Sequence, residues 1–148
     1  MTILGLDLGT KTGWATESKS GVVDFSLKRG DSQGMKFCYF GSWLRLMLDS
    51  WRPTLVAYEM PHMRGGAATE VLVGMQTRVM EECAARGIEY TSVHTATLKK
   101  WATGAGRGDK SVMIAAAERM SGRRMQDDNE ADAYLVMRWA AEKFKARS

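Results

Sequence analysis

Three acidic residues of the sequence lie where the elements of an α/β protein could bring them together. Asp7 ends the apolar segment 2–7, Glu59 follows the apolar segment 55–58, and Asp132 lies near the start of a helix predicted over about residues 129–144. In open α/β sheets, binding sites form outside the carboxyl ends of strands, at points where the strand order changes. We therefore expect the three carboxylates to meet at one edge of a sheet.

Two further candidates lie beside Asp132 in the same predicted helix. Asp128 precedes it by four residues and Asn129 by three, so either side chain can share its helix face. Carboxylates that lie close together raise one another's pKa, and a fold keeps such a cluster mainly when a cation neutralises it. Oxygen ligands of this kind suit Mg²⁺ or Mn²⁺. Two such ions about 4 Å apart could activate a water molecule and stabilise the leaving oxygen in phosphodiester hydrolysis.

Each of these residues also has an ordinary structural explanation. Asp7, two residues before Gly9, could be a turn residue, and Glu59 could be a surface charge at the end of a strand. Residues 128–130 could cap the last helix, because acidic side chains are favourable in a first turn. Spacing alone leaves both explanations open.

Basic residues are concentrated in the second half of the chain. Four of them lie in or beside a glycine-rich segment at 104–108 and three more follow, namely Lys99, Lys100, Arg107 and Lys110, then Arg119, Arg123 and Arg124. The formal net charge is only +4, so charge alone is weak support for a polyanionic partner. The cluster could contact a nucleic acid or could be the solvated face of a helix.

The length of 148 residues suits one domain, and we expect residues 1–148 to form it. No apolar run is long enough to cross a membrane, and the N-terminus has no secretory signal pattern. The two cysteines, Cys38 and Cys83, both fall in apolar helical patterns, which predicts buried free thiols and a reducing cytoplasm.

The elements that must position the acidic residues follow from apolar periodicity. Strands are expected at residues 2–7, 14–17, 22–27, 55–58 and 88–93, with a tight turn at 9–13. An apolar stripe from Phe40 to Trp51 predicts a helix that Pro53 ends, and a second helix is expected over 68–85 with Gly87 as its C-terminal cap. Thr95 could cap a short helix, Asp109 or Ser111 could open another that ends near residue 120, and the last is 129–144. Three strands followed by alternating helices and strands predict an α/β fold with a five-stranded mixed sheet, an antiparallel meander plus parallel strands, flanked by helices.

Four segments of the chain, in order, resemble motifs of the RuvC-like Holliday junction resolvases of the ribonuclease-H-like superfamily, particularly the shorter phage-type members. They cover nearly the whole chain: residues 5–15 (GLDLGTKTGWA), 56–59 (VAYE), 93–100 with 104–110 (VHTATLKK, GAGRGDK) and 129–133 (NEADA). The first motif alone is unspecific, because sugar kinases and actin-like ATPases share such a hairpin. Four motifs at these spacings in so short a chain are specific.

The resemblance implies a ribonuclease-H-like fold and a homodimer that hydrolyses DNA strands at four-way junctions with two Mg²⁺ ions, which Mn²⁺ could replace. It makes Asp7, Glu59 and Asp132 metal ligands and places Lys110 near the scissile phosphate. Cellular members often carry a second Asp where this chain has Asn129, so either Asp128 or Asn129 would complete the metal site. The residues expected to contact DNA are Lys11, Arg64, Lys99, Lys100, Arg107 and Lys110.

The resemblance carries further expectations about the protein's partners and setting. The apolar helix 68–85 is the expected dimer interface, and a bacterial or phage-infected cytoplasm is the expected location. Neither a membrane nor a small-molecule cofactor is expected.

Three other functions remain to be weighed against a junction resolvase. An actin-like phosphotransferase would need a second domain, for which the chain has no room. A DNA-junction-binding protein with a weakened site would be consistent with Asn129. A nuclease of the same fold could also act on flaps, forks or RNA–DNA hybrids.

Overall fold

The computed structural model describes residues 1–105 and 108–145 of the chain. Its elements, in chain order, are β1 (Ile3–Asp7), β2 (Lys11–Ala15), β3 (Ser20–Asp24), α1 (Gln33–Trp51), β4 (Leu55–Met60), α2 (Ala67–Arg86), β5 (Glu89–His94), α3 (Thr95–Thr103), α4 (Lys110–Ser121) and α5 (Asp128–Lys145).

The five strands form one mixed sheet in the order β3-β2-β1-β4-β5. The first three strands pair antiparallel, whereas β4 pairs parallel to both β1 and β5. This is the five-stranded mixed sheet that the sequence predicts. The strand order changes direction at β1, which has an antiparallel neighbour on one side and a parallel neighbour on the other.

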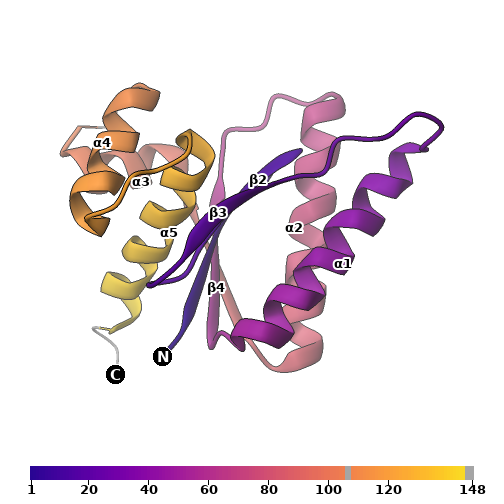
Figure 1. Cartoon of the computed structure of the whole chain (residues 1–148), viewed down its shortest axis with the longest axis horizontal. Helices are drawn as coiled ribbons and strands as arrows, with labels where there is room; N and C mark the ends of the chain where they lie inside the picture. Colours follow the sequence, from indigo (N-terminus) through magenta and orange to yellow (C-terminus); the bar gives the residue numbers. More distant parts are fainter. Residues whose placement is uncertain (106–107, 146–148) are drawn as a thin grey trace.

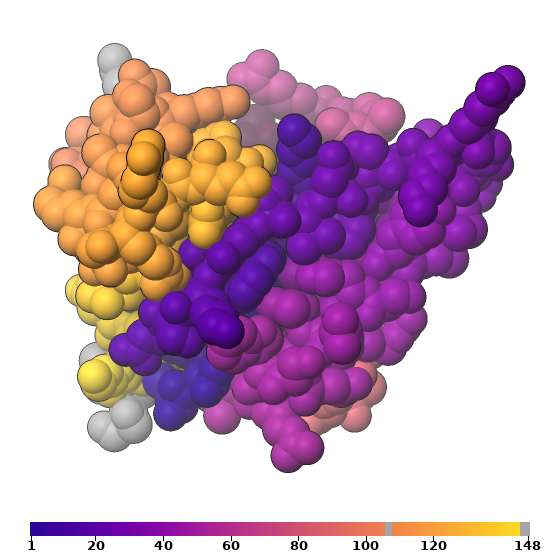
Figure 2. Space-filling model, in the orientation of Figure 1, coloured from indigo at the N-terminus to yellow at the C-terminus, as the bar shows by residue number. Residues whose placement is uncertain are grey.

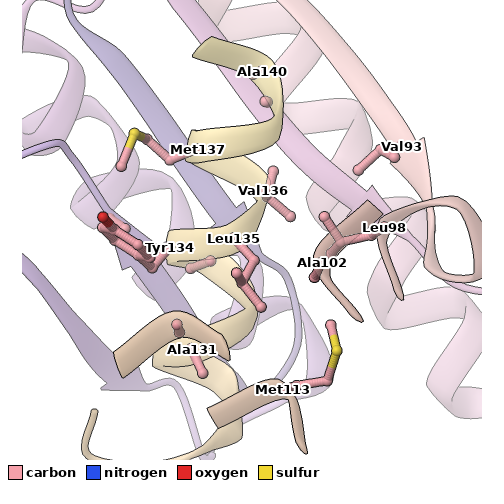
Figure 3. Close-up of a cluster of buried hydrophobic side chains, with 14 of the residues drawn as sticks. Val93, Leu98, Ala102, Met113, Ala131, Tyr134, Leu135, Val136, Met137 and Ala140 are labelled. Atoms are coloured by element: carbon pink, nitrogen blue, oxygen red, sulfur yellow. The ribbon is translucent and has the colours of Figure 1, made fainter. Parts of the chain in front are cut away.

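Helices cover both faces of the sheet (Figure 1). One face packs against α1 and α2, and its core includes Leu4, Leu6, Phe40 and Met75. The other face packs against α3, α4 and α5, and Figure 3 shows this second core between α5 and the neighbouring helices. In the space-filling view of Figure 2 the chain around β3 runs between the α4–α5 side and the α1 side.

The alternation of side chains along β1 and β4 sends their acidic residues to the α5 face. Leu4 and Leu6 belong to the core under α1 and α2, whereas Ile3 belongs to the core under α5. Because successive side chains of a strand point to opposite faces, Asp7 follows Ile3 to the α5 side. The same alternation places Glu59 on the face of Leu55 and Ala57. The two strands are paired with Leu6 opposite Tyr58, so the register continues with Asp7 beside Glu59.

Helix α5 lies directly on the backbone of β1 and β2, where two glycines leave room for it. A Cβ atom at Gly5 would lie 2.4 Å from the main-chain oxygen of Ala133, and one at Gly13 would lie 1.9 Å from that of Asn129. Neither contact is possible with a side chain at these positions. The first two turns of α5, which carry Asp128 and Asp132, are therefore placed at the carboxyl end of β1.

The predicted boundaries of the second and third strands are wrong. Lys11, Thr12 and Gly13 belong to β2 rather than to a turn over residues 9–13, and Ser20 and Gly21 already belong to β3. Gly13 resembles a turn residue in the sequence, but its role is to admit the backbone of α5. Thr12 is fully buried within the strand.

Other local predictions had mixed outcomes. Gly87 does end α2 in the left-handed conformation, and the side chain of Asp109 does cap α4 by accepting a hydrogen bond from the Val112 amide. The side chain of Thr95 does not cap α3: the residue before the helix is His94, and Thr95 is the first residue inside it.

The two cysteines differ in their surroundings. Both are free thiols, as predicted, and Cys83 is buried, which raises the pKa of its thiol to about 11. Cys38 is exposed, contrary to the prediction, because it lies off the apolar stripe of α1.

None of the helices within residues 1–105 and 108–145 is both long and apolar enough to cross a membrane.

Candidate metal centre

Carboxylates from β4 and α5 line one cleft at the carboxyl edge of the parallel strands. Its volume is about 420 Å³, and Glu59, Asp128 and Asp132 all contribute to its wall. The basic side chains of Lys99 and Lys110 line the same cleft, together with Pro61, Thr95, Leu98, Gly108, Asp109 and Met113. Acidic residues separated by up to 73 positions in the sequence are thus neighbours in space.

Asp7 lies within electrostatic reach of all three. Its pKa is raised well above the usual value for an aspartate, first by burial and then by the charges of Glu59, Asp132 and Asp128. Like charges raise a carboxyl pKa in this way only when they are close in a poorly hydrated site. The structure therefore brings together the three acidic residues that the sequence singled out.

The crowding of carboxylates also affects Asp132. Burial and the charges of Glu59 and Asp128 raise its pKa to about 7, although Lys99 opposes the shift. Its Oδ1 atom is buried and has no hydrogen-bond partner among the described residues. A buried polar atom normally has a partner, so an orphaned carboxylate oxygen indicates a position built for a ligand.

Glu59 is almost completely buried and is held by a residue of the neighbouring element. The hydroxyl of Thr95 donates a hydrogen bond of 2.6 Å to Glu59 Oε1. Burial raises the pKa of Glu59, while the Thr95 hydrogen bond and the charge of Lys99 lower it. Thr95 and Lys99 therefore keep the carboxyl of Glu59 closer to its ionised form than burial alone would.

The two candidates for a fourth ligand are placed differently. Asp128 lines the cleft, and its Oδ2 atom lies 3.8 Å from the Nζ atom of Lys110. The side-chain amide of Asn129 instead donates a hydrogen bond of 3.4 Å to Asp127, and Asn129 does not line the cleft. The geometry favours Asp128 as the fourth carboxylate beside Asp7, Glu59 and Asp132.

The carboxylates are neighbours rather than a closed coordination shell. No group of three or more His, Cys, Asp or Glu side chains in residues 1–105 and 108–145 is already arranged around a single point. The donor set nevertheless fits a hard divalent cation, because every candidate atom is a carboxylate oxygen. The mutual rise of the pKa values and the orphaned Asp132 Oδ1 are the signs of negative charge that a cation would neutralise.

The predicted DNA-contacting residues are divided by the structure. Lys99 and Lys110 belong to the cleft itself, and Lys110 is 83% exposed at its rim. Lys100, Lys11 and Arg64 are exposed but do not line the cleft. Arg107 lies outside the residues that the structure describes.

Two residues near the carboxylates are not among the site residues predicted from the sequence. Thr95 is predicted only as a helix cap, and no spacing in the sequence signals its hydrogen bond to Glu59. Asp127 caps α5 by accepting a hydrogen bond of 2.9 Å from the Glu130 amide, and its charge contributes to the raised pKa of Asp7. An Asp three positions before Glu130 matches a capping pattern, so this second residue could have been found.

The apolar face of α2 is not available as a dimer interface. Met75, Val79 and Cys83, which line that face, are fully buried against the sheet and α1, and Leu72 packs against them. On the exposed side of α2 the large apolar residue is Val73, which is 45% exposed. The apolar stripe is explained by the core, so the reasoning that pointed to this helix as an interface does not hold.

Comparison with known structures finds proteins that share this fold. RuvC of Thermus thermophilus is similar over 99% of this chain and 96% of its own, with a TM-score of 0.79 and 18% sequence identity. The same protein in complex with a Holliday junction substrate gives a TM-score of 0.79 with 17% identity, over 99% of this chain and 95% of the other. The yeast mitochondrial Holliday junction resolvase Ydc2 gives 0.65 with 16% identity, over 98% and 81%.

Comparison of sequences alone finds much less. No protein-family model and no curated protein matches the chain. At identities below 20% the likeness to solved structures concerns the course of the backbone. The resemblance inferred from the sequence motifs is confirmed at that level: the chain has the ribonuclease-H-like fold of the RuvC Holliday junction resolvases.

Proposed function

We propose that this protein is a metal-dependent endodeoxyribonuclease that hydrolyses phosphodiester bonds at four-way DNA junctions. The observation that carries the proposal is the group of four carboxylates, Asp7, Glu59, Asp128 and Asp132, at the carboxyl edge of β1 and β4. Three of them have raised pKa values. The group lies in a fold whose solved relatives include a resolvase bound to a junction.

The four carboxylates are the residues that would hold the metal, with two Mg²⁺ ions as the proposed complement and Mn²⁺ as a substitute. When bound, such ions supply a more acidic water and neutralise charge on the phosphate. An acidic pair or triad without a counter-charge is unfavourable in a partly buried site. A bound cation, which would offset the repulsion among the four carboxylates, is therefore the best explanation for their proximity.

The chain's own basic residues would act on the nucleic acid at the mouth of the cleft. Lys110 is exposed at the rim, beside Asp128, where a phosphate entering the cleft would meet it. Lys99 lies further inside, close enough to lower the pKa of both Glu59 and Asp132. Contacts to phosphate position a DNA strand without reading its sequence, which suits an enzyme that selects a DNA shape.

A homodimer is part of the proposal. A four-way junction offers two equivalent strands. A pair of subunits related by a two-fold axis would present one cluster of four carboxylates to each strand. Light scattering on the purified protein tests this: a mass of two chains supports it, and a monomer at concentrations that support paired cleavage contradicts it. A location in the cytoplasm, where DNA is accessible, goes with the same proposal.

The proposed activity is tested with a panel of labelled substrates in Mg²⁺ and in Mn²⁺. The panel contains a four-way junction, a fork, a flap, an RNA–DNA hybrid and a linear duplex. Cleavage of the four-way junction in preference to the others supports the proposal. Preference for a flap, fork or hybrid would change the proposed substrate and leave the proposed hydrolysis unchanged. Binding without cleavage in either metal would contradict the enzymatic assignment.

A further inference from the structure

Thr95 lies where β5 ends and α3 begins, and from this position its hydroxyl reaches Glu59. Strand β5 runs parallel to β4, with Glu59 opposite Val93 and Met60 opposite His94. The chain turns into α3 immediately after His94, so Thr95 is the first helical residue beyond the end of the sheet. Its hydroxyl reaches back across the strand pair and donates to Glu59 Oε1 at 2.6 Å.

The hydrogen bond is not part of a helix cap. Thr95 is the first residue inside α3, and the N-cap residue, His94, makes no side-chain cap hydrogen bond. Glu59 is only 8% exposed, so its orientation depends on the groups around it. Lys99 lies four residues after Thr95 on the same helix, and both line the cleft.

We infer that Thr95 is a positioning residue for Glu59, which holds one carboxylate oxygen so that the other is presented to a divalent cation. The inference rests on the proposed metal-dependent function. Partners of this kind orient metal-binding carboxylates, and their loss typically lowers metal affinity or activity by about 10- to 100-fold.

Three substitutions separate the hydroxyl from the shape of the side chain. Thr95→Val keeps the shape and removes the donor, and Thr95→Ser keeps the donor. Thr97→Val makes the same change at an exposed position of the same helix and serves as the matched control. If Thr95→Val does not fold, as judged by circular dichroism, Thr95→Ala takes its place.

The readout is Mn²⁺ affinity without DNA, measured from free Mn²⁺ by electron paramagnetic resonance. We expect Thr95→Val to weaken Mn²⁺ binding by about tenfold, with Thr95→Ser and Thr97→Val within about threefold of the parent protein. Junction cleavage by Thr95→Val should recover as Mn²⁺ is raised, because the lost affinity is overcome by concentration.

Two results would overturn the inference in distinguishable ways. Parent-like Mn²⁺ affinity in Thr95→Val, with a parent protein that binds Mn²⁺ and cuts, removes the role of Thr95 and leaves the proposed function intact. A parent protein that binds no Mn²⁺ removes the proposed metal centre and the inference together.

Discussion

Gly13 of β2 lies against the main chain of Asn129 in α5, so closely that a Cβ atom at position 13 would be 1.9 Å from the Asn129 oxygen. The neighbouring atoms are backbone, which cannot move aside as a flexible side chain can. This contact places the first turn of α5 over the end of the meander. The positions of Asp128 and Asp132 relative to Asp7 therefore depend on a residue that has no side chain.

The first prediction is that Gly13→Ala destabilises the protein and separates its carboxylates. Forcing an extra group into a packed contact typically costs about 1–3 kcal/mol, and here α5 would have to shift as well. The free energy of unfolding, measured by urea denaturation, should fall by at least that amount. Gly9→Ala is the matched control, because its Cβ would meet only the Lys11 oxygen at an ordinary 3.6 Å. Equal stability of the two variants would show that α5 is not held by this contact.

The same contact explains what could be predicted from the sequence and what could not. The apolar segments 2–7 and 55–58 predict the strands, because apolar patterning is a local signal. The acidic residues at the ends of these segments predict the site, because sites in such sheets form at the carboxyl ends of strands. The prediction of a turn over residues 9–13 is wrong because the need for Gly13 comes from a helix more than a hundred residues later.

Side-chain contacts between elements could not be predicted from the sequence either. The hydrogen bond from Thr95 to Glu59 depends on where β5 ends relative to β4, which no sequence spacing reports. The choice between Asp128 and Asn129 depends on the rotation of the first turn of α5. The apolar stripe of α2 was correctly recognised as apolar, but a sequence pattern does not say whether the core or a second subunit covers it.

The second prediction concerns pH and the stability of the metal-free protein. The folded-state pKa of Asp132 is raised from 3.8 to about 7, so the folded protein holds a proton that the unfolded chain releases earlier. The stabilisation is complete below pH 4 and is lost as the pH rises toward and through 7. Its size is on the order of 4 kcal/mol for a shift of this magnitude. Asp7 and Glu59, whose pKa values are also raised, act in the same direction.

Urea denaturation in EDTA at pH 5 and pH 8 measures this effect. The parent protein should lose stability between the two values, and Asp132→Asn should lose clearly less because it removes the titrating group. Added Mg²⁺ should restore stability to the parent at pH 8. The same loss of stability in both proteins would exclude Asp132 as the source.

The third prediction distinguishes Asp128 from Asn129. Asp128 lines the cleft beside Lys110, whereas the amide of Asn129 bonds to Asp127. Asp128→Asn should therefore reduce Mn²⁺ affinity and junction cleavage by about tenfold or more, and Asn129→Ala should change either by less than about threefold. The reverse order of effects would make Asn129 the fourth ligand. Asn129→Asp is informative too, since a gain in affinity would indicate a site limited by its charge.

The fourth prediction is that Lys110 contacts a phosphate of the DNA. Lys110→Ala should weaken junction binding and lower the slope of log affinity against log salt by about 0.9, the value for one phosphate contact. Lys143→Ala removes the same charge from the last turn of α5, away from the cleft, and should leave the slope unchanged. Equal slopes in both variants would reduce Lys110 to a general surface charge.

The central claim is that the protein cuts four-way DNA with a divalent cation held by the four carboxylates Asp7, Glu59, Asp128 and Asp132. Strand cleavage of a labelled four-way junction in Mg²⁺, compared between the parent protein and Asp7→Asn, tests it most directly. We predict paired nicks at symmetric positions by the parent protein and none in EDTA. Asp7→Asn should bind the junction but cut it more slowly by more than the roughly 100-fold that loss of a supporting residue can cause. Unchanged cleavage by Asp7→Asn, or equal cutting of a linear duplex by the parent protein, would contradict the claim.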